Sequence, residues 1–283
     1  IEAALQSATV RIAELNRSLV APLGSMPIDP KEIDYLYESE RPLYEMPSPE
    51  LDEAALAIGS LVSELIADGS CIQTGIGAIP AAILSQLSDK NDLGMHGGLI
   101  DDAGMHLINK GNLSGRVKTI DKQLHVVGMA LGSQSLYDWL STQQRVTFKG
   151  ANYTHEASVI SQLDDFVSIN SALEIDLYGQ INAEFTGGRQ LSGTGGSVDF
   201  MRAAKASKRG KSIVAMNATA KGGSVSRIVP KVELVTALRT DIDIVVTEFG
   251  VANLKNLPTS QRAEALIEIA APSFREELRR SIA

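Results

Sequence analysis

Strand-like and helix-like segments alternate along almost the whole chain, and this alternation constrains the fold more than any other feature. Residues 50–68 carry apolar side chains at helical spacing, and residues 71–80 follow as a short strand, a glycine-rich turn and a helix start. Further strand-like runs occupy residues 123–131, 212–217 and 241–250. Because strands that alternate with helices pair in parallel, we expect an open, mostly parallel α/β sheet with helices on both faces.

Residues 165–185 depart from this pattern because apolar and polar residues alternate. One predicted face holds Val167, Ile169, Leu173, Ile175 and Leu177, and the other holds Asn170, Glu174, Asp176 and Tyr178. Gly179 and Gln180 then turn the chain. The segment predicts a β-hairpin with one apolar and one polar face, from which Glu174 and Asp176 project.

Composition excludes several classes of protein. The 283 residues suffice for one large α/β domain or two smaller ones, and the net charge of −8 argues against nucleic-acid binding. Cys71 is the only cysteine, so an intramolecular disulfide is impossible, and the four histidines lack metal-ligand spacing. No apolar run is long enough for a membrane span. We therefore expect a cytoplasmic protein without a metal site.

The chain begins with Ile1 rather than Met, which suggests a fragment or a processed chain. A stretch rich in Pro and Glu at 38–50 reads as a surface connection. We therefore expect residues 1–48 to be a linking segment from an upstream domain, and residues 49–283 to form the main domain.

Three motifs suggest ligand contacts. Gly75 and Gly77 lie between a strand and a helix, and Gly193, Gly195 and Gly196 precede a probable helix at 198–207. Glycines there let the backbone approach an anionic ligand beside free helix N–H groups, although a tight turn would need the same residues.

The third motif, KGGSVSRIVP at 221–230, contains Lys221 and Ser226. It could be a positive loop for an anion or a flexible solvated loop. Glu174 is open to two interpretations as well, a solvated residue on an exposed face or a nucleophile in a cleft.

In combination these segments resemble the acetyl-CoA hydrolase/transferase family, and its 4-hydroxybutyrate CoA-transferase members in particular. NSALEIDLYGQINAE is similar to the segment around the family's catalytic glutamate, and QTGIGAIPAAIL and GTGGSVDF look like its two glycine loops. KGGSVSRIVP, VVTEFGVANL and RAEALIEIAAPSFREEL follow in the family's order. The likeness covers roughly residues 50–280 and corresponds to the family's C-terminal part.

The resemblance implies a CoA transferase-like (NagB-like) α/β fold and CoA transfer from an acyl-CoA to a short-chain carboxylate. Glu174 would be the catalytic residue that forms a glutamyl-CoA thioester with ping-pong kinetics. Gly75 and Gly77 would serve the acyl oxyanion. The CoA contacts would come from five residues: Gly193, Gly195, Gly196, Lys221 and Ser226. CoA would be a substrate with no permanently bound cofactor, and the expected assembly is a homodimer.

Two alternatives stay open. An acyl-CoA hydrolase would use the same glutamate, and a non-catalytic ligand-binding domain could have the same fold. The sequence also departs from the family at residues 96–103, HGGLIDDA, where many members have a glutamate at the position of Gly98. No function is therefore assigned to Gly98, and the acyl group stays open.

Overall fold

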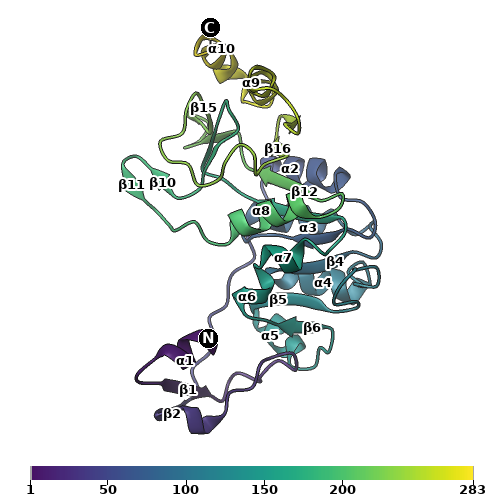
Figure 1. Ribbon diagram of the computed structural model, residues 1–283, viewed down its shortest axis with the longest axis vertical. Helices are drawn as coiled ribbons and strands as arrows, with labels where there is room; N and C mark the ends of the chain where they lie inside the picture. Colours follow the sequence, from purple (N-terminus) through teal and green to yellow (C-terminus); the bar gives the residue numbers. More distant parts are fainter. Residues whose placement is uncertain (1, 283) are drawn as a thin grey trace.

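The computed structural model describes residues 2–282 and has an eight-stranded sheet at its centre (Figure 1). The strand order is β17-β16-β12-β7-β3-β4-β5-β6. The strands are β3 (Cys71–Gln73), β4 (Gly94–Ile100), β5 (His125–Ala130), β6 (Val146–Phe148), β7 (Phe166–Asn170), β12 (Lys211–Ala215), β16 (Ile244–Thr247) and β17 (Gly250–Asn253). Only the β16–β17 pair is antiparallel among these eight strands. The open, mostly parallel sheet is therefore confirmed.

Helices cover both faces of the sheet, as predicted. One series consists of α2 (Glu53–Glu64), α3 (Ala78–Ser85), α4 (Asp102–Lys110) and α5 (Gln134–Leu140), and the other of α6 (Ala151–Thr154), α7 (Ala157–Ile160) and α8 (Ser197–Ala206). Successive strand residues point to opposite faces. Ile72 and Val167 therefore pack with the first series, whereas Cys71 and Phe166 pack with Phe200 of α8.

The order of the strands creates a switch point between β3 and β7. From β3 the chain proceeds outward through β4 and β5 to β6, then returns to β7 on the other side of β3 and proceeds through β12 to β16. In open α/β sheets, ligands bind beyond the carboxyl ends of the strands where the order reverses. The topology thus predicts a ligand site among the residues that follow β3 and β7.

A smaller three-stranded sheet follows β7. It contains β15 (Ile228–Val229), β8 (Glu174–Asp176) and β9 (Ile181–Asn182), with β8 parallel to β15 and antiparallel to β9. The amide N–H of Gly179 donates to the carbonyl of Asp176 at 2.8 Å and closes the turn. The predicted hairpin is therefore confirmed between β8 and β9.

The first part of the predicted hairpin belongs elsewhere. Residues 166–170 form β7, which pairs with β3 and β12 in the central sheet and is buried along nearly its whole length. The alternation at Ser168 and Asn170 was misleading because these polar side chains are satisfied by Gln73 on the next strand, not by solvent.

The C-terminal helices cover the outer part of the second face. α9 (Thr259–Glu268) and α10 (Pro272–Arg280) are separated at Pro272, as predicted. Their apolar residues Leu266, Ile267 and Leu278 join Val214 and Val245 in one buried cluster. None of the helices in residues 2–282 has the length and apolar character needed to cross a membrane.

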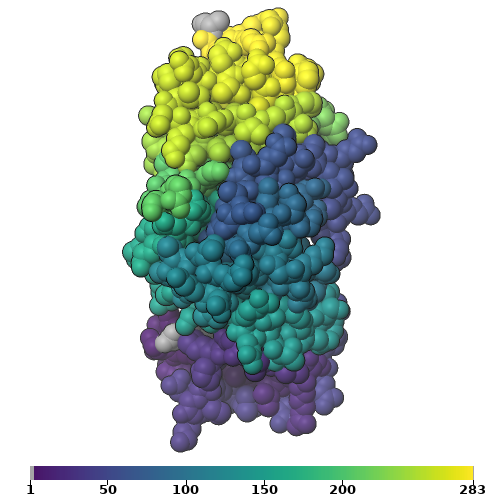
Figure 2. Space-filling model, turned by 90° about the vertical axis from the view of Figure 1, so that its right-hand side faces the viewer, coloured from purple at the N-terminus to yellow at the C-terminus, as the bar shows by residue number. Residues whose placement is uncertain are grey.

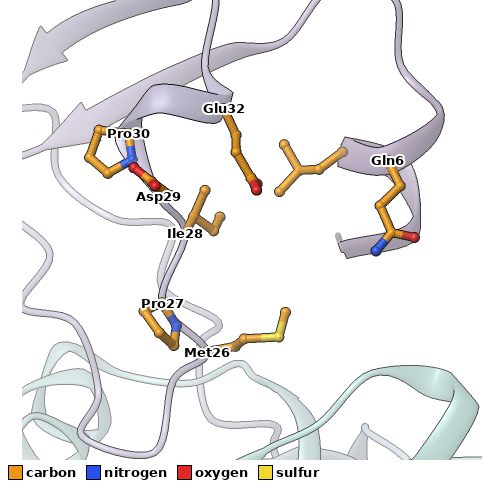
Figure 3. A pocket seen from close by; sticks show the side chains of 8 residues that line it. Gln6, Met26, Pro27, Ile28, Asp29, Pro30 and Glu32 are labelled. Carbon is orange, nitrogen blue, oxygen red and sulfur yellow. The ribbon is translucent and has the colours of Figure 1, made fainter.

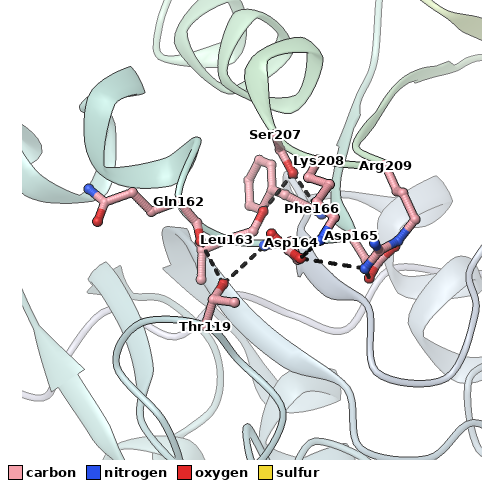
Figure 4. Close-up of polar contacts among 9 residues, drawn as sticks. All are labelled: Thr119, Gln162, Leu163, Asp164, Asp165, Phe166, Ser207, Lys208 and Arg209. Atoms are coloured by element: carbon pink, nitrogen blue, oxygen red, sulfur yellow. Dashed lines mark hydrogen bonds and ion pairs between the residues drawn. The ribbon is translucent and has the colours of Figure 1, made fainter.

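Polar contacts fix the amino ends of β7 and β12, at the edge opposite the switch-point loops (Figure 4). Arg209 Nη2 contacts Asp165 Oδ2 at 2.5 Å, and Ser207 Oγ donates to the carbonyl of Leu163 at 2.5 Å. The Arg209 guanidinium lowers the pKa of Asp165 by hydrogen bonding. These contacts hold the amino ends of β7 and β12 in register. The switch-point loops lie at the carboxyl edge of the sheet, away from these contacts.

The N-terminal segment lies at one end of the molecule (Figure 2). It contains α1 (Glu2–Ser7), β1 (Ile12–Asn16), η1 (Pro30–Glu32) and β2 (Tyr35–Ser39), with β1 and β2 paired in parallel. A pocket between α1 and residues 26–32 is lined by Leu5, Gln6, Met26 and Glu32 among others (Figure 3). It contains none of the residues that the sequence suggested for chemistry.

Candidate active site

A polar network joins the carboxyl ends of β3 and β7. Gln73 pairs with Ser168 across the two strands, and Ser168 Oγ donates to Gln73 Oε1 at 3.0 Å. Asn170 Nδ2 donates to the same oxygen at 3.2 Å and to Ser168 Oγ at 2.8 Å. Buried polar groups that satisfy one another in this way keep the strand ends together. The hydrogen bonds therefore fix the positions from which the segments after β3 and β7 begin.

The first of these segments is the turn that contains Gly75 and Gly77. Gly77 is the N-cap of α3 and has φ 108°, a conformation that side chains other than glycine's rarely adopt. Apart from its own chain neighbours, a Cβ on either glycine would meet no atom of residues 2–282 within 4 Å. The turn thus presents open backbone at the start of an eight-residue helix, as the sequence suggested.

The second segment leads from Asn170 to Glu174 at the start of β8. Glu174 is half-buried and lies opposite Asn182 in the β8–β9 pair. Asn182 Nδ2 donates to Glu174 Oε2 at 3.1 Å. A buried amide therefore holds one oxygen of the Glu174 carboxylate. Both residues lie on a short hairpin that follows β7, one of the two strands at the switch point.

Asp176 does not share these surroundings, contrary to the expectation that both carboxylates project from one polar face. It is fully buried, and its Oδ1 accepts hydrogen bonds from the backbone N–H groups of Tyr178 and Gln180 at 3.0 and 2.9 Å. Gln180 Nε2 donates to the other oxygen at 2.8 Å. The turn encloses Asp176, so this carboxylate stabilises the hairpin and is closed to a substrate.

The KGGSVSRIVP segment lies directly beside Glu174. The amide N–H of Ile175 donates to the carbonyl of Arg227 at 2.9 Å, and Ile175 pairs with Ile228 of β15. Lys221 lies at the exposed tip of a hairpin between β13 (Thr219–Ala220) and β14 (Val225–Ser226). Two motifs about 50 residues apart in the sequence therefore meet in the small sheet.

Ser226 is less available than the sequence suggested. Its Oγ donates to the carbonyl of Ile228 at 2.7 Å and accepts from the Ile228 N–H at 3.2 Å. The hydroxyl thus bridges a turn between β14 and β15. Its role as a CoA contact stays a prediction, in which the hydroxyl could only accept a hydrogen bond because its O–H is already used.

The second glycine loop leads into α8, whose N-cap is Gly196. Gly193 and Gly195 face open space, with φ +57° at Gly195, whereas a Cβ on Gly196 would clash with the His155 ring. Glycine at 196 therefore accommodates a side chain of the protein itself. The two other glycines keep the open backbone that ligand binding would need.

His155 links this loop to β4. A Cβ on Gly98 would lie 3.3 Å from the His155 ring, which contacts Phe200 with ring centroids 4.5 Å apart. His155 Nδ1 hydrogen-bonds with Thr154 Oγ1 at 2.8 Å, and burial lowers the pKa of the imidazole. The absence of a side chain at 98 is therefore matched by a histidine that lies against the glycine.

Sequence reasoning did not identify Gln73, Asn182 or His155 as parts of this region. Asn182 follows the turn with the same alternation as Glu174, so cross-strand pairing in the predicted hairpin could have placed the two side by side. No comparable signal pointed to Gln73 or His155, because their partners are distant in the sequence.

The fold and the site together define a doubly wound α/β protein in which a glycine-rich turn follows β3 and a half-buried carboxylate follows β7, the two strands that flank the switch point. A sequence profile of the acetyl-CoA hydrolase/transferase C-terminal domain matches residues 132–282. The chain is 42% identical over 278 residues to 4-hydroxybutyrate coenzyme A transferase of Clostridium kluyveri. This match covers 97% of the chain and 65% of that relative. The chain therefore belongs to the acetyl-CoA hydrolase/transferase family.

Solved structures agree. The crystal structure of RipA from Yersinia pestis has a TM-score of 0.93 at 38% identity, covering 98% of this chain and 64% of RipA. A 4-hydroxybutyrate CoA-transferase from Porphyromonas gingivalis has a TM-score of 0.87 at 37% identity, covering 99% of this chain and 68% of that one. The resemblance seen in the ordered motifs is thus confirmed, and the chain spans slightly less than two thirds of the Clostridium kluyveri relative and of RipA.

Proposed function

We propose that the protein containing this chain transfers CoA from an acyl-CoA to a short-chain carboxylate, with Glu174 as the carrier of CoA. The observation that supports this most strongly is the position of Glu174, half-buried beyond the carboxyl end of β7 with one oxygen hydrogen-bonded to Asn182. Family membership adds that CoA-transferases are among the relatives with this fold.

The proposed chemistry begins when one oxygen of Glu174 attacks the thioester carbonyl, which expels CoA thiolate and leaves a mixed anhydride. The thiolate then attacks the glutamyl carbonyl, releases the first acid and leaves a glutamyl-CoA thioester. An acceptor carboxylate reverses both steps. A carboxylate nucleophile suits this reaction because donor and acceptor acids pass through similar transition states.

The oxyanion on the acyl carbonyl needs hydrogen-bond donors. The open backbone at Gly75 and Gly77 and the loop at Gly193 and Gly195 are our candidates. Loss of one such donor typically raises the barrier by about 2.7–4 kcal/mol. For CoA itself, the exposed Lys221 and the glycine loop before α8 remain the proposed contacts, with CoA entering as a substrate.

Acyl-CoA hydrolysis is the second candidate, because the family description names hydrolases as well as transferases. Water would then replace the acceptor acid at the glutamyl-CoA thioester. The two reactions share every residue proposed above, so only the fate of the acyl group distinguishes them.

The test compares acyl exchange with CoA release in the whole protein. Short acyl-CoAs are offered with and without short carboxylates, and initial rates are measured over a grid of both substrates. We expect acyl exchange to exceed free CoA release and the double-reciprocal lines to be parallel, as for a ping-pong reaction. CoA release that is unchanged by any carboxylate indicates a hydrolase, and intersecting lines would exclude the covalent route.

A further inference from the structure

We infer that the side-chain amide of Asn182 is a catalytic donor to the glutamyl carbonyl oxygen while Glu174 carries CoA. This inference rests on the proposed function and adds a residue to it. In the structure, Asn182 Nδ2 lies 3.1 Å from Glu174 Oε2, and Asn182 is fully buried.

The orientation of this amide is fixed by the chain around it. Asn182 Oδ1 accepts from the backbone N–H groups of Glu184 and Phe185 at 3.2 and 3.0 Å, and Nδ2 donates to the carbonyl of Phe185 at 2.7 Å. A backbone N–H requires an oxygen as its partner, and a carbonyl requires an N–H. The amide therefore cannot be reversed without losing three bonds, and its NH₂ group has to face Glu174.

This bond matters most when Glu174 is the group under attack. As CoA thiolate adds to the glutamyl carbon, the C–S bond forms and the electron pair of the C=O bond moves to the retained oxygen. The pair returns when the bond to the other oxygen breaks and the acid leaves as its carboxylate. No proton is transferred in the step. The charge that develops on the retained oxygen lies where the Asn182 N–H points.

Asn182 thus serves a different oxyanion from the glycine turns. The turns would stabilise charge on the acyl carbonyl of the substrate, whereas Asn182 would stabilise charge on the glutamyl carbonyl of the enzyme. A donor held rigid and buried is effective because it needs no reorganisation as the charge develops. The same amide also keeps the free carboxylate oriented before the first attack.

Two substitutions separate this role from a purely structural one. Asn182→Ala removes the donor, and Asn182→Asp keeps the size but places an oxygen against Glu174 Oε2. In the aspartate variant, two carboxylates share one site, so one of them binds a proton more tightly. A further carboxyl group lies two residues along the chain on Glu184, whose Oε2 accepts from Thr236 Oγ1 at 2.8 Å.

The matched control is Gln180→Ala. Gln180 Nε2 donates to Asp176 at 2.8 Å, so this change removes an amide–carboxylate bond of the same type from the same hairpin without touching Glu174. If Asn182 had only a structural role, Asn182→Ala and Gln180→Ala should lower the rate of CoA attachment to a similar extent.

The measurement is the single-turnover rate at which CoA becomes covalently attached to the whole protein after mixing with acyl-CoA. For Asn182→Ala we expect a rate lower by about 10²–10³-fold, with little change in the acyl-CoA concentration that gives half of the maximal rate. Asn182→Asp should be at least as slow at neutral pH and should recover as the pH falls, because the shared proton restores a donor. Gln180→Ala should retain the wild-type rate.

The outcomes are distinguishable. If the wild-type protein attaches no CoA, the proposed function fails. If the wild type attaches CoA and Asn182→Ala does so at the same rate, the function stands and this inference is wrong. Equal losses in Asn182→Ala and Gln180→Ala, or a milder effect of Asn182→Asp with no pH recovery, would also overturn it.

Discussion

At the scale of single residues, two carboxylates two positions apart on β8 have opposite surroundings. Asp176 accepts three hydrogen bonds inside the turn and is fully buried, whereas Glu174 is half-buried and has one oxygen bonded to Asn182. A carboxylate whose oxygens are enclosed cannot reach a thioester. The structure thus favours Glu174 over Asp176 for the proposed covalent step, and it assigns Asp176 to the stability of the hairpin.

Two buried histidines should make the free energy of unfolding depend on pH. His96 and His125 are fully buried, and burial lowers the pKa of His96 to about 4 and that of His125 to about 3. In the unfolded chain both bind a proton near pH 6.5. The unfolded state therefore takes up more protons as the pH falls below about 6.5, and the native state loses stability until about pH 4 for His96 and about pH 3 for His125.

We expect the free energy of unfolding to fall by up to about 1.4 kcal/mol per pH unit for each histidine in this window. Urea unfolding at several pH values between 7.5 and 4.5 measures the slope. His125→Gln should reduce it, whereas His106→Gln, at an exposed position on α4, should not. A slope that is unaffected by His125→Gln would show that other groups cause the acid sensitivity.

At the scale of elements, those with strong local patterns were predictable. α2, β5, β12 and the break before α10 follow from apolar spacing and from Pro272. β4 was not predicted because its glycines have low strand propensity. The packing explains one of these glycines, because a Cβ on Gly97 would lie 3.1 Å from the Gln73 side chain.

The site was predictable where it lies on one segment and not where it depends on contacts between segments. The hairpin that carries Glu174 has a local signal in its alternation and its turn. The assignment of residues 166–170 to the central sheet depends on Gln73, about 95 residues earlier, which no local pattern reveals. The contact between Gly98 and His155 is non-local for the same reason.

The turn between β3 and α3 allows a matched pair of substitutions. Both glycines face open space, but Gly77 has φ 108° and Gly75 does not have a positive φ. Gly77→Ala should lower the free energy of unfolding by about 1–3 kcal/mol, because a Cβ strains this conformation. Gly75→Ala should leave stability within about 0.5 kcal/mol of the wild type.

Activity then distinguishes ligand binding from folding in the same pair. If the turn contacts the acyl-CoA, Gly75→Ala raises the KM or lowers kcat although the fold is intact, because the added methyl group occupies the open side of the turn. Unfolding in urea and steady-state kinetics measure both effects. Wild-type kinetics for a stable Gly75→Ala variant would mean that the turn has only a structural role.

At the scale of the whole molecule, the hydrophobic clusters lie between residues 58 and 278. The N-terminal segment has a different character. Ile12 and Tyr35 on its two-stranded sheet are 68% and 65% exposed, and an isolated sheet of two strands is marginally stable in water. We propose, on this basis, that residues 1–48 link the domain at 49–283 to a further part of the protein that covers these strands.

A deletion tests this division. Residues 49–283 alone should unfold in urea with the same midpoint as residues 1–283, because every cluster residue is retained. The deletion removes hydrogen bonds at the edge of the domain and no residue of the clusters. These bonds run from the Phe148 N–H to the Gly24 carbonyl, from the Tyr137 hydroxyl to the Tyr44 carbonyl, from the Gln134 N–H to Glu45, and from the Met46 N–H to the Gly132 carbonyl. A much lower midpoint, or loss of a cooperative transition, would show that the N-terminal segment belongs to the same folding unit.

The central claim is that Glu174 carries CoA as a thioester, and mass mapping of the adduct tests it most directly. The whole protein is mixed with an acyl-CoA in the absence of acceptor, treated with borohydride to reduce a thioester to an alcohol, and digested. We expect the mass change on the peptide containing LEIDLYGQ, at Glu174, and its loss in Glu174→Ala. A change at Asp176 instead, or transfer that proceeds in full with no residue modified by any acyl-CoA that supports turnover, would contradict the claim.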